Sequence, residues 1–144
     1  MRHVLRLVLT AVTLALSAQL AHAQGVNIPP PGAVTYVYSD SDGQGTLTVT
    51  PLGVSTNIPA PGARQIQVRI TQNGNQYTGS GISYPLAQTN PLTLLTFAVV
   101  DAVGRTYFFQ GTLNPGFGVR GQGTYFAASF PEDTSPWSIT GIAQ

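Results

Sequence analysis

The 144-residue sequence has no cysteine and no lysine, and it holds only two histidines and one methionine. Both histidines and the methionine lie within residues 1–23, which have the order of a secretory signal peptide. Arg2 and Arg6 come first, an apolar run follows, and Ala21-His22-Ala23 ends the segment with small residues. We therefore expect a helical signal peptide that is cleaved after Ala23, and a secreted or periplasmic product without His, Cys, Met or Lys.

These absences exclude most catalytic chemistry. Without histidine there is no Ser-His-Asp triad, without lysine there is no Ser-Lys dyad or Schiff base, and without cysteine there is no thiol nucleophile. Zinc, copper and haem sites need imidazole or sulfur ligands, so only a cation bound by oxygen atoms remains feasible. We therefore expect a protein that is not an enzyme and that has no cofactor and no metal.

Charge is also scarce, at 8% of all residues. Residues 24–144 carry four arginines against five acids, a formal charge of −1. Four scattered arginines cannot neutralise a row of phosphates, so nucleic acid is not expected as a partner. No apolar stretch after the signal reaches the roughly 20 residues of a membrane-spanning helix, so membrane insertion is not expected. The oligomeric state is left open.

What the sequence does contain is a repeat. The segment Asn27–Ala33 returns as Asn57–Ala63, identical at every position but the fourth, and Asn90-Pro91 and Asn114-Pro115 are looser echoes. Each of the four is followed by an extended run, a turn and a second extended run. These four segments predict four hairpins within one β domain over residues 34–144. The preceding residues 24–33 are predicted to be a Pro-rich extended arm.

The second hairpin carries the clearest pattern. Residues 65–71 alternate strictly, with Ile66, Val68 and Ile70 on one face and polar side chains on the other. Asn73-Gly74 follows, and this dipeptide is a strong hairpin signal because both residues tolerate positive φ. The other hairpins are predicted at 34–38 with 45–50, 92–100 with 105–113, and 119–129 with 137–142, the last pair joined by a turn over Pro131–Pro136.

Four hairpins make eight antiparallel strands with no helical pattern after Ala33. We predict an all-β fold, an eight-stranded up-and-down β-barrel, with a two-sheet β-sandwich as the alternative. The pairs Gly79/Gly81 and Gly121/Gly123 fall in mid-strand, where glycine permits a sharp bend or a close approach of another backbone. The general arrangement resembles lipocalin-type and avidin-type barrels in architecture alone, so the resemblance implies no functional residues.

Two kinds of short motif resemble parts of known ligand sites. Asp40-Ser41-Asp42-Gly43-Gln44-Gly45 has the oxygen spacing that begins a calcium loop, but a later bidentate glutamate and flanking helices are missing. Gly43-Gln44-Gly45-Thr46 and Gly121-Gln122-Gly123-Thr124 are glycine pairs without the lysine and helix of a phosphate loop. A polar hairpin turn and bent strands account for these segments.

Aromatic residues supply the candidate binding site. Five of them fall on one inward phase of the predicted strands: Tyr77, Tyr107, Phe109, Tyr125 and Trp137. A barrel mouth lined by Tyr and Trp suits a small apolar or neutral ligand, although core packing alone also explains such residues. We therefore expect a secreted, non-catalytic module that binds such a ligand in the barrel mouth. The alternatives are a structural protein of the cell envelope or extracellular matrix with a packed interior and, as a minor one, a small outer-membrane barrel.

Overall fold

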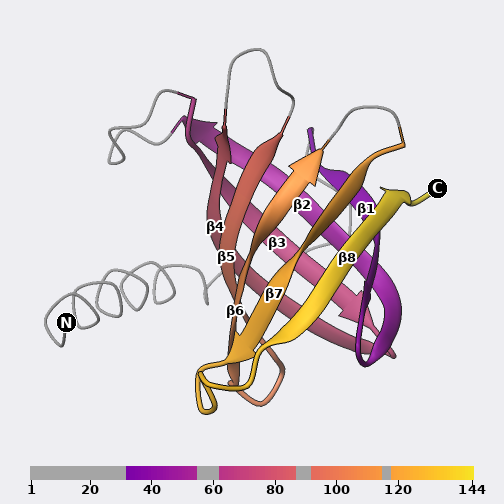
Figure 1. Ribbon diagram of the computed structural model, residues 1–144, viewed down its shortest axis with the longest axis vertical. Coiled ribbons are helices and arrows are strands. Elements are labelled where there is room, and N and C mark those ends of the chain that lie inside the picture. Colours follow the sequence, from indigo (N-terminus) through magenta and orange to yellow (C-terminus); the bar gives the residue numbers. More distant parts are fainter. Residues whose placement is uncertain (1–31, 55–61, 87–91, 115–117) are drawn as a thin grey trace, which may run out of the picture.

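The computed structural model describes residues 32–54, 62–86, 92–114 and 118–144. These residues form eight β-strands: β1 (Val34–Asp40), β2 (Gly43–Val54), β3 (Arg64–Gln72), β4 (Asn75–Pro85), β5 (Thr93–Val100), β6 (Thr106–Asn114), β7 (Arg120–Ala127) and β8 (Ser135–Ile142). Each strand pairs antiparallel with the next, and β8 pairs with β1 to close the barrel (Figure 1). The predicted up-and-down barrel is confirmed, and the two-sheet alternative is not formed. The predicted signal peptide, and the arm apart from its last two residues, lie outside the described residues.

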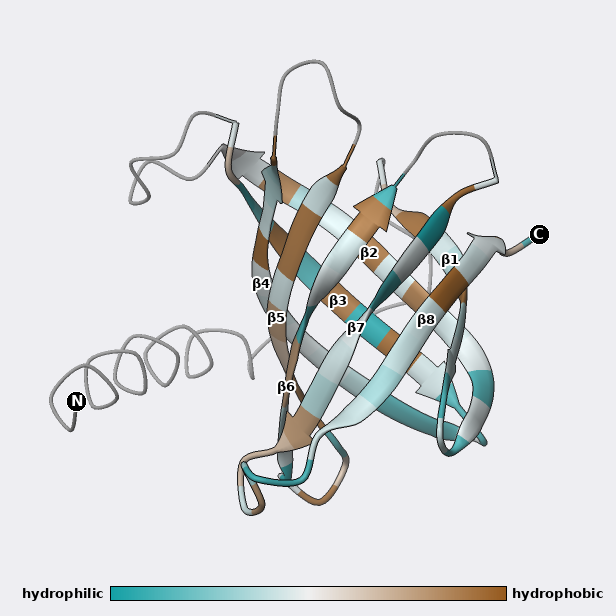
Figure 2. Ribbon diagram, viewed as in Figure 1, coloured by the Kyte–Doolittle hydropathy of each residue, from teal (hydrophilic) through white to brown (hydrophobic). Residues whose placement is uncertain are grey.

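The second hairpin forms as its pattern predicts. Ile66, Val68 and Ile70 are buried while the residues between them are exposed, and β3 is accordingly banded brown and teal in Figure 2. Gln72 pairs with Asn75 across a two-residue turn in which Asn73 and Gly74 have φ values of 51° and 77°. Positive φ at both central residues matches the right-handed twist of the strands, so the turn sets the register of the whole hairpin.

The turns that join β1 to β2, β3 to β4, β5 to β6 and β7 to β8 lie together at one end of the barrel (Figure 1). The repeated Gly-Ala that precedes the first two hairpins behaves the same way in both copies, because Gly32 and Gly62 have φ values of 91° and 83° and each lies two residues before a strand. One boundary prediction is wrong. β7 ends at Ala127, and β8 begins at Ser135, so Pro136 lies in a strand instead of the turn.

The reason lies in the connection between β7 and β8. The Phe130 N–H donates to the carbonyl of Ala127 and the Asp133 N–H donates to that of Phe130, so two successive tight turns reverse the chain earlier than predicted. Pro136 is exposed on β8, opposite Thr124 of β7. It is the second residue of β8, and β8 pairs with β1 only from Trp137 onward, so the proline falls at the end of the ladder, where it is tolerated.

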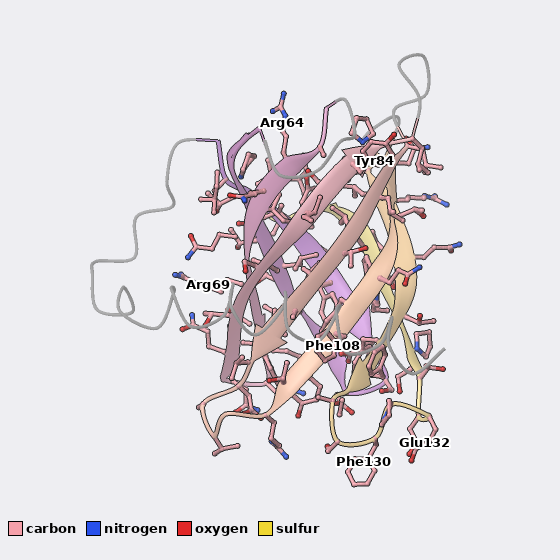
Figure 3. All side chains as sticks on the ribbon, turned by 90° about the vertical axis from the view of Figure 1, so that its left-hand side faces the viewer. Arg64, Arg69, Tyr84, Phe108, Phe130 and Glu132 are labelled. Atoms are coloured by element: carbon pink, nitrogen blue, oxygen red, sulfur yellow. The ribbon has the colours of Figure 1, made fainter. Side chains whose placement is uncertain are left out.

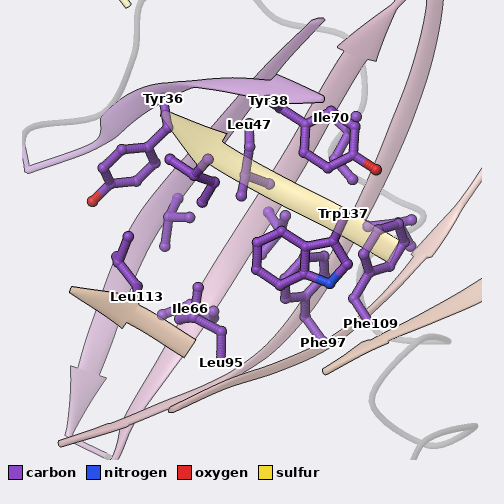
Figure 4. Close-up of a cluster of buried hydrophobic side chains, with 14 residues drawn as sticks. Tyr36, Tyr38, Leu47, Ile66, Ile70, Leu95, Phe97, Phe109, Leu113 and Trp137 are labelled. Atoms are coloured by element: carbon purple, nitrogen blue, oxygen red, sulfur yellow. The ribbon is translucent and has the colours of Figure 1, made fainter. Parts of the chain in front are cut away.

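The interior of the barrel is filled by side chains. A cluster of fourteen buried hydrophobic residues comes from six of the eight strands (Figure 4), and its largest members are Tyr36, Tyr38, Phe97, Phe109 and Trp137. Strands β4 and β7 contribute glycines at their inward positions instead. A Cβ on Gly79 would overlap the carbonyl oxygen of Ala98 on β5. The mid-strand glycines thus mark close approaches of neighbouring backbone, one of the two explanations that the sequence suggested.

The outer wall is mostly polar and almost uncharged, apart from an apolar patch where Phe108 of β6 packs against Phe126 of β7 with ring centroids 5.4 Å apart. Its outward positions are dominated by threonine, glutamine and serine, and the labelled Arg64 and Arg69 point away from the barrel in Figure 3. All five acids of the sequence lie at the hairpin-turn end, at Asp40, Asp42, Asp101, Glu132 and Asp133. None of the described residues belongs to a helix that could cross a membrane.

Candidate functional site

A small pocket opens at the hairpin-turn end of the barrel, with a volume of about 70 Å³. Its lining residues are Tyr38, Asp40, Asp42, Ile70, Gln72, Tyr77, Tyr107, Phe109 and Tyr125. Four of the five predicted ligand-binding residues therefore meet there. The fifth, Trp137, lies on the same inward face but deeper, packed in the core with 2% of its surface exposed.

The aromatic rings of this pocket form an ordered stack. Phe109 lies between Phe97 and Tyr125, with ring centroids 4.8 and 4.9 Å apart and interplanar angles of 8° and 11°. These residues are register partners on β5, β6 and β7, so the strand pairing itself aligns their rings. Tyr77 and Tyr107 meet edge to face at 5.8 Å, and burial raises the pKa of both phenols.

The polar side of the pocket centres on Asp40. Its Oδ2 accepts a hydrogen bond from the Tyr38 hydroxyl at 2.7 Å, and its Oδ1 accepts from the Gln72 amide at 2.6 Å and the Asp42 backbone N–H at 2.8 Å. Gln72 also donates to the carbonyl of Gly43 at 2.9 Å. Burial, and then the bond to Asp40, raise the pKa of Tyr38 far above its ordinary value. This network ties the ends of β1 and β3 together.

Asp40 and Gln72 were not among the predicted site residues, although a signal for each was present. Gln72 continues the inward alternation of Ile66, Val68 and Ile70, and Asp40 stands two residues after the inward Tyr38. Asp40 begins the segment whose oxygen spacing resembles the start of a calcium loop. Its oxygens instead accept three hydrogen bonds, and the described residues hold no group of three His, Cys, Asp or Glu side chains that could share a metal.

A second and larger hollow lies on the outer wall. This groove of about 800 Å³ crosses β5 to β8 and reaches the end of β1. It is lined by Ser39, Asp40, Ser41, Leu94, Gln110, Gly111, Thr112, Gln122, Gly123, Thr124, Pro136, Trp137 and Ser138. We call it the outer groove. Its chemistry differs from that of the pocket, because amide and hydroxyl side chains replace the aromatic rings.

The middle of the outer groove is a pair of glycines. Gly111 of β6 pairs with Gly123 of β7, and a Cβ on either would meet the indole of Trp137 from inside the barrel. The Trp137 Nε1–H donates to the carbonyl of Thr124 at 3.2 Å. The sequence pattern singles out Gly121-Gln122-Gly123-Thr124 and predicts the neighbouring strand at 105–113, but not the matching motif on that strand. The shorter tripeptide Gln-Gly-Thr reveals it, because this tripeptide occurs at 44–46, 110–112 and 122–124.

Fold and sites together define a class: a closed, eight-stranded antiparallel barrel with a filled interior, a small aromatic pocket at one end and a neutral polar groove on its wall. Comparison of the chain with models of protein families, with curated proteins and with solved structures finds no match.

Proposed function

We propose that the exported chain is a secreted, non-catalytic structural or adhesive protein of the cell envelope or extracellular matrix, and that its working surface is the outer wall of the barrel. The observation that carries this proposal is the filled interior. Fourteen buried hydrophobic side chains occupy it, and the pocket left at the hairpin-turn end measures about 70 Å³. Small-molecule sites usually measure roughly 300–1,000 Å³, so this pocket has room for a few water molecules.

The composition of the wall supports the same proposal. Outward positions of the strands carry neutral hydrogen-bonding groups, as at Thr78, Thr96, Gln110 and Gln122, and these side chains are exposed. Such a wall suits contact with water and with neutral polar partners better than contact with lipid, where exposed amide and hydroxyl groups lack partners. The sequence adds the signal segment that would bring the chain to that compartment.

A second candidate is a small apolar or neutral ligand held in the barrel mouth. It is favoured by one specific observation, the convergence of Tyr77, Tyr107, Phe109 and Tyr125 on a single pocket beside the polar pair Asp40 and Gln72. A ligand larger than a few atoms requires these rings to move apart. Movement of that kind costs the stacking of Phe109 on Tyr125, whose centroids lie 4.9 Å apart.

Binding measurements with matched variants separate the two candidates. The purified mature chain is sedimented with the envelope and matrix fraction of the producing cells, and its melting temperature is measured with and without that fraction. Tyr107→Phe with Tyr125→Phe removes two hydroxyls at the mouth, whereas Gln67→Arg and Thr124→Arg place charge on opposite parts of the wall. If the wall is the working surface, a wall variant weakens sedimentation and the mouth variant matches the wild type. The proposal is overturned if the wall variants sediment like the wild type while the mouth variant sediments less. In that case the fraction should raise the melting temperature of every chain except the mouth variant.

A further inference from the structure

The outer groove is built around a near two-fold arrangement of side chains. Gln110 pairs with Thr124 on one side of the Gly111–Gly123 pair, and Thr112 pairs with Gln122 on the other. Two copies of Gln-Gly-Thr thus run antiparallel with their glycines aligned. The alternation of strand side chains turns all four polar groups outward, while the glycine positions face Trp137.

The amide groups of this arrangement are available for a ligand. Gln110, Gln122 and Thr124 are exposed, and the side-chain amides of both glutamines have no hydrogen-bond partner among the described residues. Diagonal neighbours in an antiparallel pair lie about 7–8 Å apart. At this spacing the two amides can each contact a different polar group of one ligand that carries such groups at repeated intervals.

The groove is also neutral. Asp40 is the one charged residue in its lining, at the end formed by β1, and its carboxylate is engaged by the Tyr38 hydroxyl, the Gln72 amide and the Asp42 N–H. No arginine lines the groove. An anionic ligand would find no countercharge here, and a cationic one would find a carboxylate that is already satisfied. The charge pattern selects an uncharged occupant.

Amides and hydroxyls each donate and accept hydrogen bonds, as the hydroxyl groups of a sugar do. Leu94 and Pro136 flank the polar groups with apolar surface, which suits the C–H face of a sugar ring. The volume of about 800 Å³ lies near the top of the roughly 300–1,000 Å³ range of small-molecule sites, so the groove has room for more than one sugar unit. A chain of sugars fits these features better than a single unit.

We infer that the outer groove binds a linear neutral glycan, with Gln110 and Gln122 each hydrogen-bonded to hydroxyls of different sugar units. This inference rests on the proposed function, in which the wall is the working surface, and adds the site and the class of ligand. The repeated motif offers the same amide and hydroxyl groups on both sides of the glycine pair, which matches a chain of repeated sugar units. Such binding suits a protein anchored to an extracellular matrix.

The test is a titration of the isotope-labelled mature chain, followed through its backbone amide signals by nuclear magnetic resonance. The probes are cellohexaose, maltohexaose and xylohexaose, and oligogalacturonate serves as the anionic counterpart. We expect at least one neutral probe to shift the amide signals of Gly111 and Gly123 saturably, and oligogalacturonate to bind more weakly. Gln110→Ala with Gln122→Ala should weaken that affinity at least about tenfold, which corresponds to 1.4 kcal/mol.

Two controls keep the outcomes distinct. Gln65→Ala with Gln67→Ala removes two exposed amides from β3, outside the groove, and should leave the affinity unchanged. Unchanged melting temperatures show that both double variants remain folded. If neutral glycans shift signals elsewhere on the wall, or if none binds while the envelope fraction still does, the glycan inference fails and the proposed function stands. If the shifts fall on Tyr77 and Tyr107 in the mouth, the glycan inference and the proposed function both fail. Self-association through β6 and β7, seen by sedimentation, also overturns the inference.

Discussion

Gly111 and Gly123 face each other across β6 and β7, and the indole of Trp137 fills the interior space that their missing side chains leave. The register brings Trp137 beside Gly123, and the ring stays within the core, 6.4 Å from both Phe97 and Phe109. The same glycines form the middle of the outer groove. Core packing and groove shape therefore depend on one contact.

That contact predicts the effect of adding a methyl group. Gly111→Ala or Gly123→Ala would place a Cβ against the indole and also against a backbone carbonyl of the facing strand, that of Gln122 or Gln110. Overpacking of this kind typically costs about 1–3 kcal/mol of unfolding free energy. Urea unfolding of each variant measures the loss. Gly141→Ala is the control, because a Cβ there meets nothing within 4 Å, and its effect should stay within about 0.5 kcal/mol. Combining Gly111→Ala with Trp137→Phe should cost less than the sum of the two changes. Additive losses would show that the clash with the facing backbone, and not with the indole, sets the cost of the added methyl group.

A second prediction concerns alkaline pH. Burial raises the pKa of Tyr36, and burial with the bond to Asp40 raises that of Tyr38, so both phenols stay protonated in the folded barrel after their unfolded counterparts ionise near pH 10. The unfolded state then binds fewer protons, and stability falls as pH rises above about 10. Each such tyrosine contributes up to about 1.4 kcal/mol per pH unit.

The protein suits this measurement, since its sequence has no lysine or cysteine that would titrate in the same range. Unfolding free energies between pH 8 and 11.5 give the slope, and tyrosinate absorbance follows the ionisation directly. Tyr38→Phe should lower the stability at pH 8 by about 1 kcal/mol, through the lost hydrogen bond, and reduce the alkaline slope. An unchanged slope in this variant would mean that Tyr38 does not resist ionisation.

Most strands could be predicted because the alternation of side chains and the turn residues that define them lie close together in the sequence. The alternation around Ile66, Val68 and Ile70 and the positive φ of Asn73 and Gly74 act within a few residues, so the sequence reveals the hairpin and its register. Closure of the barrel could be suggested by the strand count alone. The pairing of β1 with β8 joins segments about a hundred residues apart and includes an irregularity between Tyr36 and Tyr38 that no local pattern encodes.

The sites were predicted less completely for the same reason. The inward phase brought Tyr77, Tyr107, Phe109 and Tyr125 into one candidate set, and the structure gathers them in one pocket. The pocket is small because aromatic rings from three strands stack on one another. The spacing of these residues along the sequence does not predict that stacking. The outer groove depends on the alignment of Gly111 with Gly123 across β6 and β7, a register that the residue pattern within either strand does not set.

The turn between β5 and β6 gives a prediction at acid pH. Asp101 Oδ1 accepts the backbone N–H groups of Val103 and Arg105 at 3.0 and 2.8 Å, and its Oδ2 accepts from the Arg105 guanidinium at 2.7 Å. Partial burial of the carboxylate opposes ionisation, but these bonds and the charge of Arg105 outweigh it and lower the pKa of Asp101. The folded state therefore holds the ionised form more firmly than the unfolded state does.

A lowered pKa contributes stability at neutral pH, and this contribution is lost as the pH falls from about 4 through the lowered value. Asp101→Asn should lower the urea midpoint at pH 7, and the difference from the wild type should shrink toward pH 2. Asp133→Asn is the matched control, because the Asp133 side chain is exposed, and it should leave the midpoint unchanged at both pH values. A difference that persists at pH 2 would assign the loss to the turn conformation instead of the charge.

The Asn73-Gly74 turn tests how firmly backbone conformation sets the register. Gly74 has a φ of 77°, and a Cβ there would meet nothing within 4 Å, so Gly74→Ala would act through backbone strain alone and cost about 1–2 kcal/mol. Asn73→Gly keeps the positive φ of 51° accessible but removes the side-chain bond to the carbonyl of Asp42 at 2.9 Å. Because that bond is exposed, we expect a loss below about 1 kcal/mol. Urea unfolding ranks the two variants, and hydrogen exchange of the β3–β4 amides shows whether the hairpin opens locally. If Asn73→Gly costs more than Gly74→Ala, the contact between the two turns, and not the φ values, holds this end of the barrel together.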